Sequence, residues 1–382
     1  MVDMDHPRYY NGGKGNLNTV MAANPARYKH LKDGSGMWVV RDDVYIRFRN
    51  KQGVMKGGLT IGYTGYGSEK SRHHIGPELQ IGHRLGDAAE APVLLIKTAW
   101  GGKSLYKDFR PPSAGGEVGE YYTKMHAEVK EALDNVATEF PALAGRPVDI
   151  AGFIWFQGWN DMFNKDALEQ YEDNLVHLIK DVRKEYKKPK LSVVIGELGN
   201  GGPKAGKNML AIRAAQKSAA RRKELGGNVK FVSTTAFARP KEESPNVGHG
   251  HHWFGNAESY FGIGDVLGEE MVRLIEGGSM KGSEEHPGPV ATRGTTATAR
   301  WAGQLFAGYD PARAFETIEF ADGWYREPGN EGFEATLDHL LERLKKSGFG
   351  TDDRLQLEVI ETPMRSPAWT PKSASLVLKQ TD

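Results

Sequence analysis

The stretch that decides the fold class is VDIAGFIWFQGWND, residues 148–161. It opens with a nearly continuous apolar run, which is typical of a strand buried on both faces of a parallel sheet. Three similar runs occur elsewhere in the chain: VLLIKTAW (93–100), LSVVIG (191–196) and VKFVSTT (229–235). We therefore expect these four segments to be parallel neighbours in one sheet.

Amphipathic segments separate the apolar runs. The clearest places apolar residues at steps of three and four, the period of a helix face: Leu168, Tyr171, Leu175, Leu178, Ile179, Val182 and Tyr186. Other helices are predicted over residues 77–87, 118–136, 208–224 and 262–276. This alternation predicts an α/β fold, with a doubly wound, mostly parallel sheet and helices on both of its faces.

The two ends of the chain differ from this middle part. Residues 1–36 are polar and Gly-rich, the first 16 of them predict a polar loop, and residues 38–48 predict a strand. Residues 284–300 predict a linker. The part beyond it, residues 301–382, has the strand-like segments FETIEF, LQLEVI and SLVLK and one amphipathic helix (Leu337, Leu340, Leu341 and Leu344). We expect one large domain, residues 1–283, and a small α+β appendage with no evident chemistry.

Composition argues against several classes of function. Lys and Arg number 50 and Asp and Glu 49, a balance that argues against nucleic-acid binding. No apolar run approaches the roughly 18 residues that span a membrane, and the amino end lacks the apolar core of a signal peptide. The chain has no cysteine, so disulfides, thiol nucleophiles and cysteine-bound metals are excluded. Neither compartment nor oligomeric state is indicated.

Residues that follow the strands are the candidates for chemistry, because doubly wound sheets bind ligands at the carboxyl ends of their strands. Gly101-Gly102-Lys103-Ser104 follows the first run and resembles part of a phosphate-binding loop. That loop needs a glycine where this chain has Lys97, so nucleotide binding is not expected. Gly101 can instead offer a backbone N–H to a developing oxyanion, and a simple turn is the alternative.

Gly158, Asn160 and Asp161 follow the second run. A glycine turn directly after a buried strand places the Asn160 amide at the edge of the sheet, where a neutral donor suits an oxyanion. The alternative is that Asn160 and Asp161 cap the next helix. Spacing alone supports the two interpretations equally.

The third candidate is a histidine cluster, His249, His251 and His252, which follows the fourth run. A metal site is not predicted, because no H-E-x-x-H or similar ligand spacing is present. A general base is the better interpretation, since imidazole titrates near neutral pH. A surface loop rich in histidine is the alternative.

Four segments, in this order, resemble the SGNH (GDSL-like) hydrolase superfamily, and within it the sialate O-acetylesterase-like carbohydrate esterases: IGPELQIGHRLGD, LLIKTAWGGKSLYKDFRPPS, GFIWFQGWND and HHWFGNAESYFGIGDVLG. The resemblance covers roughly residues 1–280. It implies a serine-type hydrolase that removes acetyl esters from carbohydrates without a cofactor, in a family whose members are often exported.

The resemblance also implies roles for single residues. Gly101 corresponds to an oxyanion-hole N–H donor, and Gly158, Asn160 and Asp161 match a G-x-N-D block whose Asn is the second donor. His252 corresponds to the general base. Trp100, Trp159 and Trp253 could stack on a sugar ring, although burial in the core is the simpler explanation. Because both groups must reach one reaction centre, we expect Asn160 and His252 within roughly 10 Å of each other.

Two departures from the family pattern affect the expected activity. The family's D-x-x-H block has His249 at its acid position, so Glu242, Glu243 and Glu258 are the remaining candidates for the acid. The family nucleophile is a serine in a G-Q-S-N-M-type block after a first strand, and neither is found ahead of YYNGGKGN. The sequence thus predicts an amino-terminal truncation, an unpaired edge in the sheet and an inactive chain. The alternative is a catalytically dead fold that binds carbohydrate or acts as a scaffold.

Overall fold

The computed structural model describes residues 11–65, 74–279 and 331–346. The chain divides into two compact units, residues 1–283 and 284–382. In the second unit the structure describes one helix, α11 (Glu331–Lys346), which confirms the amphipathic helix predicted there. The predicted linker and the segments FETIEF, LQLEVI and SLVLK lie outside the described residues.

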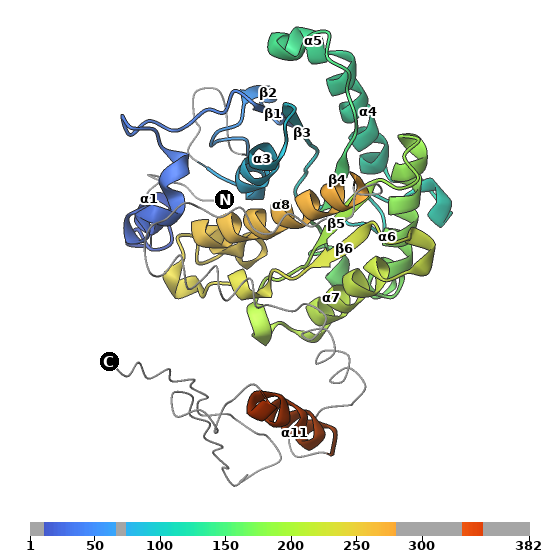
Figure 1. Ribbon diagram of the computed structural model, residues 1–382. Coiled ribbons are helices and arrows are strands. Elements are labelled where there is room, and N and C mark those ends of the chain that lie inside the picture. The colour runs from blue at the N-terminus through green and yellow to red at the C-terminus, as the bar shows by residue number, and fades with distance from the viewer. Residues whose placement is uncertain (1–10, 66–73, 280–330, 347–382) are drawn as a thin grey trace. The chain divides into compact units, whose positions relative to one another are not determined.

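The strands of the first unit form two separate three-stranded sheets (Figure 1). In the sheet with order β2-β1-β3, β1 is antiparallel to β2 and parallel to β3. In the sheet with order β4-β5-β6, all strands are parallel. The strands are β1 (Val44–Asn50), β2 (Gly53–Gly58), β3 (Val93–Lys97), β4 (Gly152–Trp155), β5 (Ser192–Gly196) and β6 (Val229–Val232).

All four apolar runs form strands, but the prediction that they are neighbours in one sheet is wrong for β3. Its partner is β1, in a register that runs from Val44 opposite Val93 to Phe48 opposite Lys97. Within the described residues no ladder joins β3 to β4, so the parallel sheet is divided between them. The hairpin of β1 with β2 was not predicted, because the Gly-rich segment GVMKGG has little strand propensity.

The predicted helices are confirmed, with small shifts at their ends: α3 (Pro77–Ala88), α4 (Glu120–Asp134), α6 (Lys165–Glu185), α7 (Lys207–Ala220) and α8 (Ala257–Ser279). Three shorter helices were not predicted: α1 (Leu17–Ala23), α2 (Pro25–Tyr28) and α5 (Val136–Glu139). The loop predicted for residues 1–16 is confirmed over its described part, residues 11–16. Buried Leu17 and Tyr28 anchor α1 and α2 to the core.

Helices cover both faces of the parallel strands, as predicted. Successive side chains of a strand point to opposite faces, and β5 shows this clearly. Val194 packs into a core with residues of α3 and α8, whereas Val193 and Ile195 pack into a second core with residues of α6 and α7. Every residue of β5 is buried, because the strand has a neighbour on each edge and a helical layer on each face.

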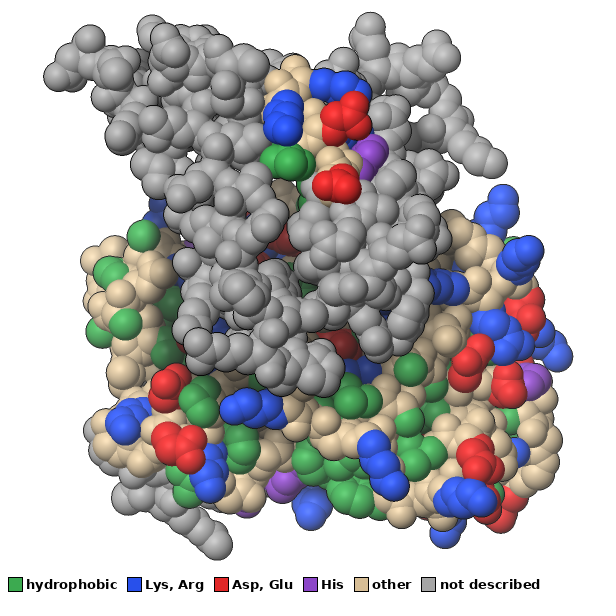
Figure 2. All heavy atoms as spheres, turned by 90° about the horizontal axis from the view of Figure 1, so that it is seen from below, with side chains coloured by type: hydrophobic (Ala, Val, Ile, Leu, Met, Phe, Trp, Pro, Cys, Tyr) green, Lys and Arg blue, Asp and Glu red, His purple; other side chains and the backbone are tan. Residues whose placement is uncertain are grey.

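The surface carries charges of both signs. On the face drawn in Figure 2, Lys and Arg side chains are interspersed with Asp and Glu side chains wherever the atoms are described. A search of the described helices for one long and apolar enough to cross a membrane finds none.

Candidate active site

The loops that leave β3 and β4 are joined by one buried carboxylate. Asp161 is 0% exposed, and its two oxygens accept hydrogen bonds from the backbone N–H groups of Leu105 and Tyr106, both at 2.9 Å. The Gln157 side-chain amide also donates to it, at 2.7 Å. Burial raises the pKa of Asp161, while these three donors oppose the rise. Asp161 therefore positions the loop after β3 and does not face a ligand.

Gln157 extends this network into the core. Its side-chain amide also donates to the carbonyl of Lys103 at 2.9 Å, a second tie between the two loops. The backbone carbonyl of Gln157 accepts hydrogen bonds from the Tyr171 hydroxyl on α6 at 2.7 Å and from the Gln216 side-chain amide on α7 at 2.9 Å. The helices on one face of the sheet thereby fix the turn that carries Asn160.

Asn160 lies beside the glycine turn that follows β3. A methyl group added at Gly102 would lie 3.8 Å from the Asn160 side-chain nitrogen. The helix-cap interpretation of Asn160 is wrong: its side chain makes no cap hydrogen bond to η5 (Asp161–Phe163), and Asn164 is the residue that caps α6. The Asn160 amide is therefore available beside Gly101 and Gly102 at the edge of the sheet.

Gly158 is required by packing. A methyl group added there would lie 2.8 Å from Cγ2 of Ile212 on α7, closer than carbon atoms approach. At Gly101, by contrast, an added methyl group would meet nothing within 4 Å. Packing therefore requires a glycine at position 158 and does not require one at position 101.

We expect Gly158→Ala to lower the free energy of unfolding by about 1–3 kcal/mol, the usual cost of overpacking a core. Urea denaturation followed by circular dichroism measures it. Gly101→Ala is the matched control, and its stability should stay within about 0.5 kcal/mol of the parent, as for open surface sites. Equal stability of the two variants would contradict the packing described for Gly158.

His252 lies in the loop η10 (Gly250–Gly255), which is held from both sides. The Asn200 side chain, from the loop after β5, donates to the carbonyl of Gly250 at 3.0 Å. The Tyr260 hydroxyl, from α8, donates to the carbonyl of His252 at the same distance. The next two residues, Trp253 and Phe254, have φ of 53° and 52°, which is uncommon for aromatic residues. The loop is strained directly beside the candidate base.

His252 is neutral at physiological pH. Its pKa is lowered to about 4, mainly by burial and in smaller part by the neighbouring imidazoles of His251 and His249. A neutral imidazole can accept a proton, as a general base must. None of the candidate acids hydrogen-bonds to this ring: Glu258 is paired instead with Arg239 at 2.9 Å. Among the described residues, no hydrogen bond joins a carboxylate to the His252 ring.

Aromatic side chains link the Asn160 turn to the histidine loop. The ring centroids of Trp159 and His251 are 5.8 Å apart, and those of His251 and His252 are 4.3 Å apart. Trp159 also contacts Phe163, which is 70% exposed and was not singled out from the sequence. Trp253 is buried, so it belongs to the core.

Ser104 follows Gly101 by three residues, and its hydroxyl is engaged within its own loop. Its Oγ donates to Oδ2 of Asp108 at 2.9 Å and accepts from the backbone N–H of Lys107 at 3.2 Å. Its backbone N–H donates to the same Asp108 oxygen at 2.8 Å. This arrangement is a local turn that orients the hydroxyl toward Asp108. Among the described residues, no group of His, Asp or Glu side chains is arranged to hold a metal ion.

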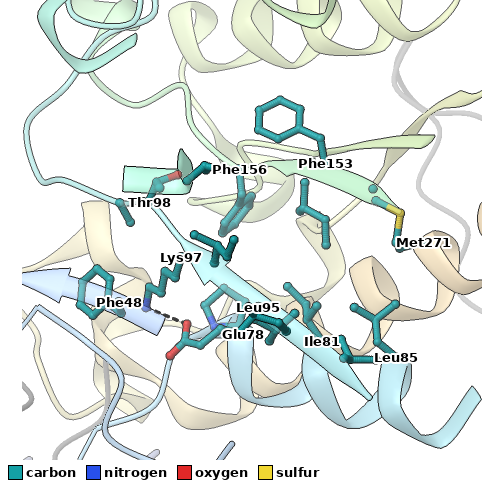
Figure 3. A pocket seen from close by; sticks show the side chains of 18 of the residues that line it. Phe48, Glu78, Ile81, Leu85, Leu95, Lys97, Thr98, Phe153, Phe156 and Met271 are labelled. Atoms are coloured by element: carbon teal, nitrogen blue, oxygen red, sulfur yellow. Dashed lines mark ion pairs between the residues drawn. The ribbon is translucent and has the colours of Figure 1, made fainter. Parts of the chain in front are cut away.

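A cavity of about 1570 Å³ is lined by two of the five candidate residues. Gly101, Gln157, His251 and His252 line it, together with residues of β3 and β4. Figure 3 shows part of its wall, with Leu95 and Phe156 facing the cavity and the Lys97–Glu78 ion pair at its side. The structure therefore brings Gly101 and His252 to one cavity. Asn160 lies beside Gly102, and Trp159 lies beside His251.

Glycine residues and amide and histidine side chains follow the ends of parallel strands in a mixed α/β fold, and comparison with known families gives the class of the protein. This chain belongs to the family of sialic acid-specific acetylesterases, which are carbohydrate esterases. The family model matches residues 62–272, more than half of the chain. The matched range includes all five candidate residues, and the family implies an acetylated carbohydrate as substrate.

Two solved structures resemble the chain in fold. One is a protein from Arabidopsis thaliana with 16% identity and a TM-score of 0.42, and the match covers 63% of this chain and 90% of that protein. The other is a carbohydrate acetylesterase from Xanthomonas citri with 14% identity and a TM-score of 0.42. That match covers 62% of this chain and spans about half, 51%, of the Xanthomonas protein. No curated protein sequence matches this chain.

Proposed function

We propose that this chain provides the oxyanion hole and the general base of a serine-type carbohydrate O-acetylesterase. The Gly101 N–H and the Asn160 amide hold the oxyanion that forms when a serine attacks the acetyl carbonyl. His252 accepts the serine proton and returns it to the leaving sugar oxygen. The observation that carries this proposal is that Gly101 and His252 line one cavity, with Asn160 beside the Gly101–Gly102 turn.

The network around Asp161 supports the oxyanion-hole part of the proposal. An oxyanion hole stabilises a transition state only if its donors are held in place before the reaction. Asp161 and Gln157 tie the loop of Gly101 to the turn of Asn160 by bonds of 2.7–2.9 Å. We infer that these residues preorganise the two donors, and that the fully buried Asp161 does not touch the substrate.

The serine that follows Gly101 is not suited to act as the nucleophile. Ser104 is bound to Asp108 and Lys107, and residues 1–382 contain no G-Q-S-N block. We therefore propose that hydrolysis needs a serine supplied by a segment other than these residues, and that the 382-residue chain alone does not turn over. A version extended at its amino end by an apolar strand and Gly-Gln-Ser-Asn, here called the serine-bearing version, serves to test the site.

Trp159 and Phe163 are the groups that we propose to recognise the sugar. Aromatic faces stack on the apolar face of a sugar ring, and this pair lies beside the Asn160 turn with Phe163 exposed. In the serine-bearing version, Trp159→Ala should raise KM for an O-acetylated sialic acid about tenfold, as expected from losing about 1.5 kcal/mol of stacking.

The matched substrate for that experiment is p-nitrophenyl acetate, which has no sugar ring. Its kcat/KM should change less than about threefold in Trp159→Ala, because the acetyl-binding groups are unchanged. An equal loss on both substrates would show that Trp159 supports the loop and does not contact the sugar.

A further inference from the structure

Two buried side chains of α7 hold the loop that follows β5. Arg213 and Gln216 are three positions apart, so they leave the same face of the helix. Both bind the backbone of Leu198: its N–H donates to Oε1 of Gln216 at 2.9 Å, and its carbonyl accepts from Nε of Arg213 at 2.7 Å. The loop after β5 is thereby fixed to α7 close to its first residue.

The Arg213 guanidinium binds two further carbonyls of the same loop. Nη2 donates to the carbonyl of Asn200 at 2.7 Å, and Nη1 donates to the carbonyl of Gly202 at 2.9 Å. Burial disfavours the charge and lowers the pKa of Arg213, and its ion pair with Glu197 is long, at 3.9 Å. The carbonyl groups therefore replace the water that the cation has lost. Because one planar group binds three carbonyls, it fixes the shape of the loop over residues 198–202.

Asn200 connects this loop to the loop of His252. Its backbone carbonyl is held by Arg213, and its side-chain amide donates to the carbonyl of Gly250 at 3.0 Å. Gly250 is the first residue of η10 and lies two positions before His252. Asn200 is only 3% exposed, so water cannot readily take the place of this donor.

The loop of His252 has a strained backbone that needs such a bond. Trp253 and Phe254, directly after the histidine, both have left-handed φ angles. Residues in this region keep their conformation only where the surroundings over-determine it. The carbonyl of His249 closes the loop from within, since it accepts from the N–H groups of His252 at 2.9 Å and Phe254 at 3.0 Å. The Asn200 side chain attaches this closed turn to the rest of the protein.

The same face of α7 also holds the turn of Asn160. Nε2 of Gln216 donates to the carbonyl of Gln157 at 2.9 Å, three residues before Asn160. One helix face, here called the α7 frame and made of Arg213 and Gln216, is thus bonded to the Asn160 turn directly and to the His252 loop through Asn200.

We propose that the α7 frame sets where His252 lies relative to Asn160, and that Asn200 is the positioning residue through which it holds His252. The value of this arrangement for catalysis rests on the proposed function, in which Asn160 and His252 act on one reaction centre. The hold on His252 itself does not rest on that function, so it can be measured in the chain without any turnover.

The test is Asn200→Ala in the full 382-residue chain, with the His252 ring as the probe. Loss of the bond to Gly250 releases the start of η10, so water should reach the ring. The pKa of His252 should then rise from about 4 to above about 5.5, toward the value of about 6.5 for a solvated imidazole. NMR of the carbon-bound ring protons follows the titration, and the signal that is lost in His252→Gln identifies this ring.

Asn228→Ala is the matched control. The Asn228 side chain also donates to the backbone carbonyl of a neighbouring loop, that of Lys190 at 2.9 Å, but it does so at the amino ends of β5 and β6. This variant should leave the pKa of His252 at about 4. A second variant, Asn200→Leu, keeps the approximate shape of the side chain without its donor. It should raise the pKa of His252 in the same way, and it replaces Asn200→Ala if that variant does not fold.

Kinetics of the serine-bearing version test the catalytic part of the proposal. Asn200→Ala should lower kcat for p-nitrophenyl acetate at least about tenfold and change KM less than about threefold, because a misplaced base slows the chemical step without weakening binding. Since the base is then protonated at a higher pH, the rate should begin to fall near pH 5.5 instead of near pH 4.

Two results would overturn the proposal. One is an unchanged pKa of His252 in both Asn200→Ala and Asn200→Leu. The other is an equal rise in Asn228→Ala, which would mean that any loosening of the loops exposes the ring. A raised pKa in the Asn200 variants together with an inactive serine-bearing parent would support the hold on His252 and refute the proposed esterase function instead.

Discussion

Replacing His252 with Ala in the serine-bearing version is expected to lower kcat/KM for p-nitrophenyl acetate at least about a hundredfold, the usual effect of losing a general base. The serine hydroxyl is a weak nucleophile until a base takes its proton. His252 is suited to this step, because burial lowers its pKa to about 4 and keeps the imidazole neutral. The rate should therefore hold as pH falls from about 8 to about 5, and decline only near the pKa.

His249→Ala is the control for this prediction. It removes an imidazole from the same loop, with its ring centroid 6.2 Å from that of His252. This variant should lower kcat/KM less than about fivefold, because the His249 imidazole takes no proton from the serine. If His249→Ala lowered kcat/KM as much as His252→Ala, the assignment of His252 as the base would be wrong, or both histidines would share the role.

Replacing Asp161 with Ala is expected to destabilise the fold by about 3 kcal/mol or more. The change leaves the N–H groups of Leu105 and Tyr106 and the Gln157 amide without their acceptor, and each unsatisfied buried donor costs about 1–3 kcal/mol. Part of this cost is offset, because the carboxylate is itself expensive to bury, as its raised pKa indicates. Urea denaturation at pH 7 gives the difference in the free energy of unfolding.

Asp161→Asn separates geometry from charge. It keeps one acceptor oxygen for Leu105 or Tyr106 and places an amide N–H against the other donor, so it should cost less than Asp161→Ala but remain destabilising. In the serine-bearing version both variants should lower kcat, because the loop that carries Gly101 loses its attachment. Parent-like stability of Asp161→Ala would show that the two loops are held together by other contacts.

Local periodicity was enough to locate the five longer helices of the first unit, α3, α4, α6, α7 and α8, and the four apolar strands. The helix α6 repeats apolar residues at every three or four positions, and the runs that became β5 and β6 are continuous. The pairing of strands could not be read in the same way, because a run such as VLLIK is equally suited to either neighbour. The structure pairs β3 with β1, and a hairpin built on GVMKGG supplies the outer strand.

The sequence was enough to propose candidate residues, but not to find the groups that position them. Gly101, Asn160 and His252 follow strands directly or lie in a distinct cluster, which is visible in sequence. Gln157 and Gln216 are 59 positions apart and meet at 2.9 Å, and no local pattern indicates such a contact. The lowered pKa of His252 likewise depends on burial by distant segments.

The interpretation of Asp161 also changed with the structure. Sequence placed it with the residues of the site, because it follows Asn160 directly. Its complete burial and its bonds to Leu105 and Tyr106 assign it to support of the loop instead. Phe163 changed in the opposite direction, from an unremarked apolar residue to an exposed aromatic beside Trp159.

The measurement that tests the central claim most directly is the steady-state release of acetate from an O-acetylated sialic acid by the 382-residue chain and by the serine-bearing version. We predict no turnover above background for the first and robust turnover for the second, lost when the added serine is replaced with alanine. Turnover by the 382-residue chain that disappears in Ser104→Ala would contradict the account, because Ser104 would then be the nucleophile in spite of its bonds to Asp108 and Lys107.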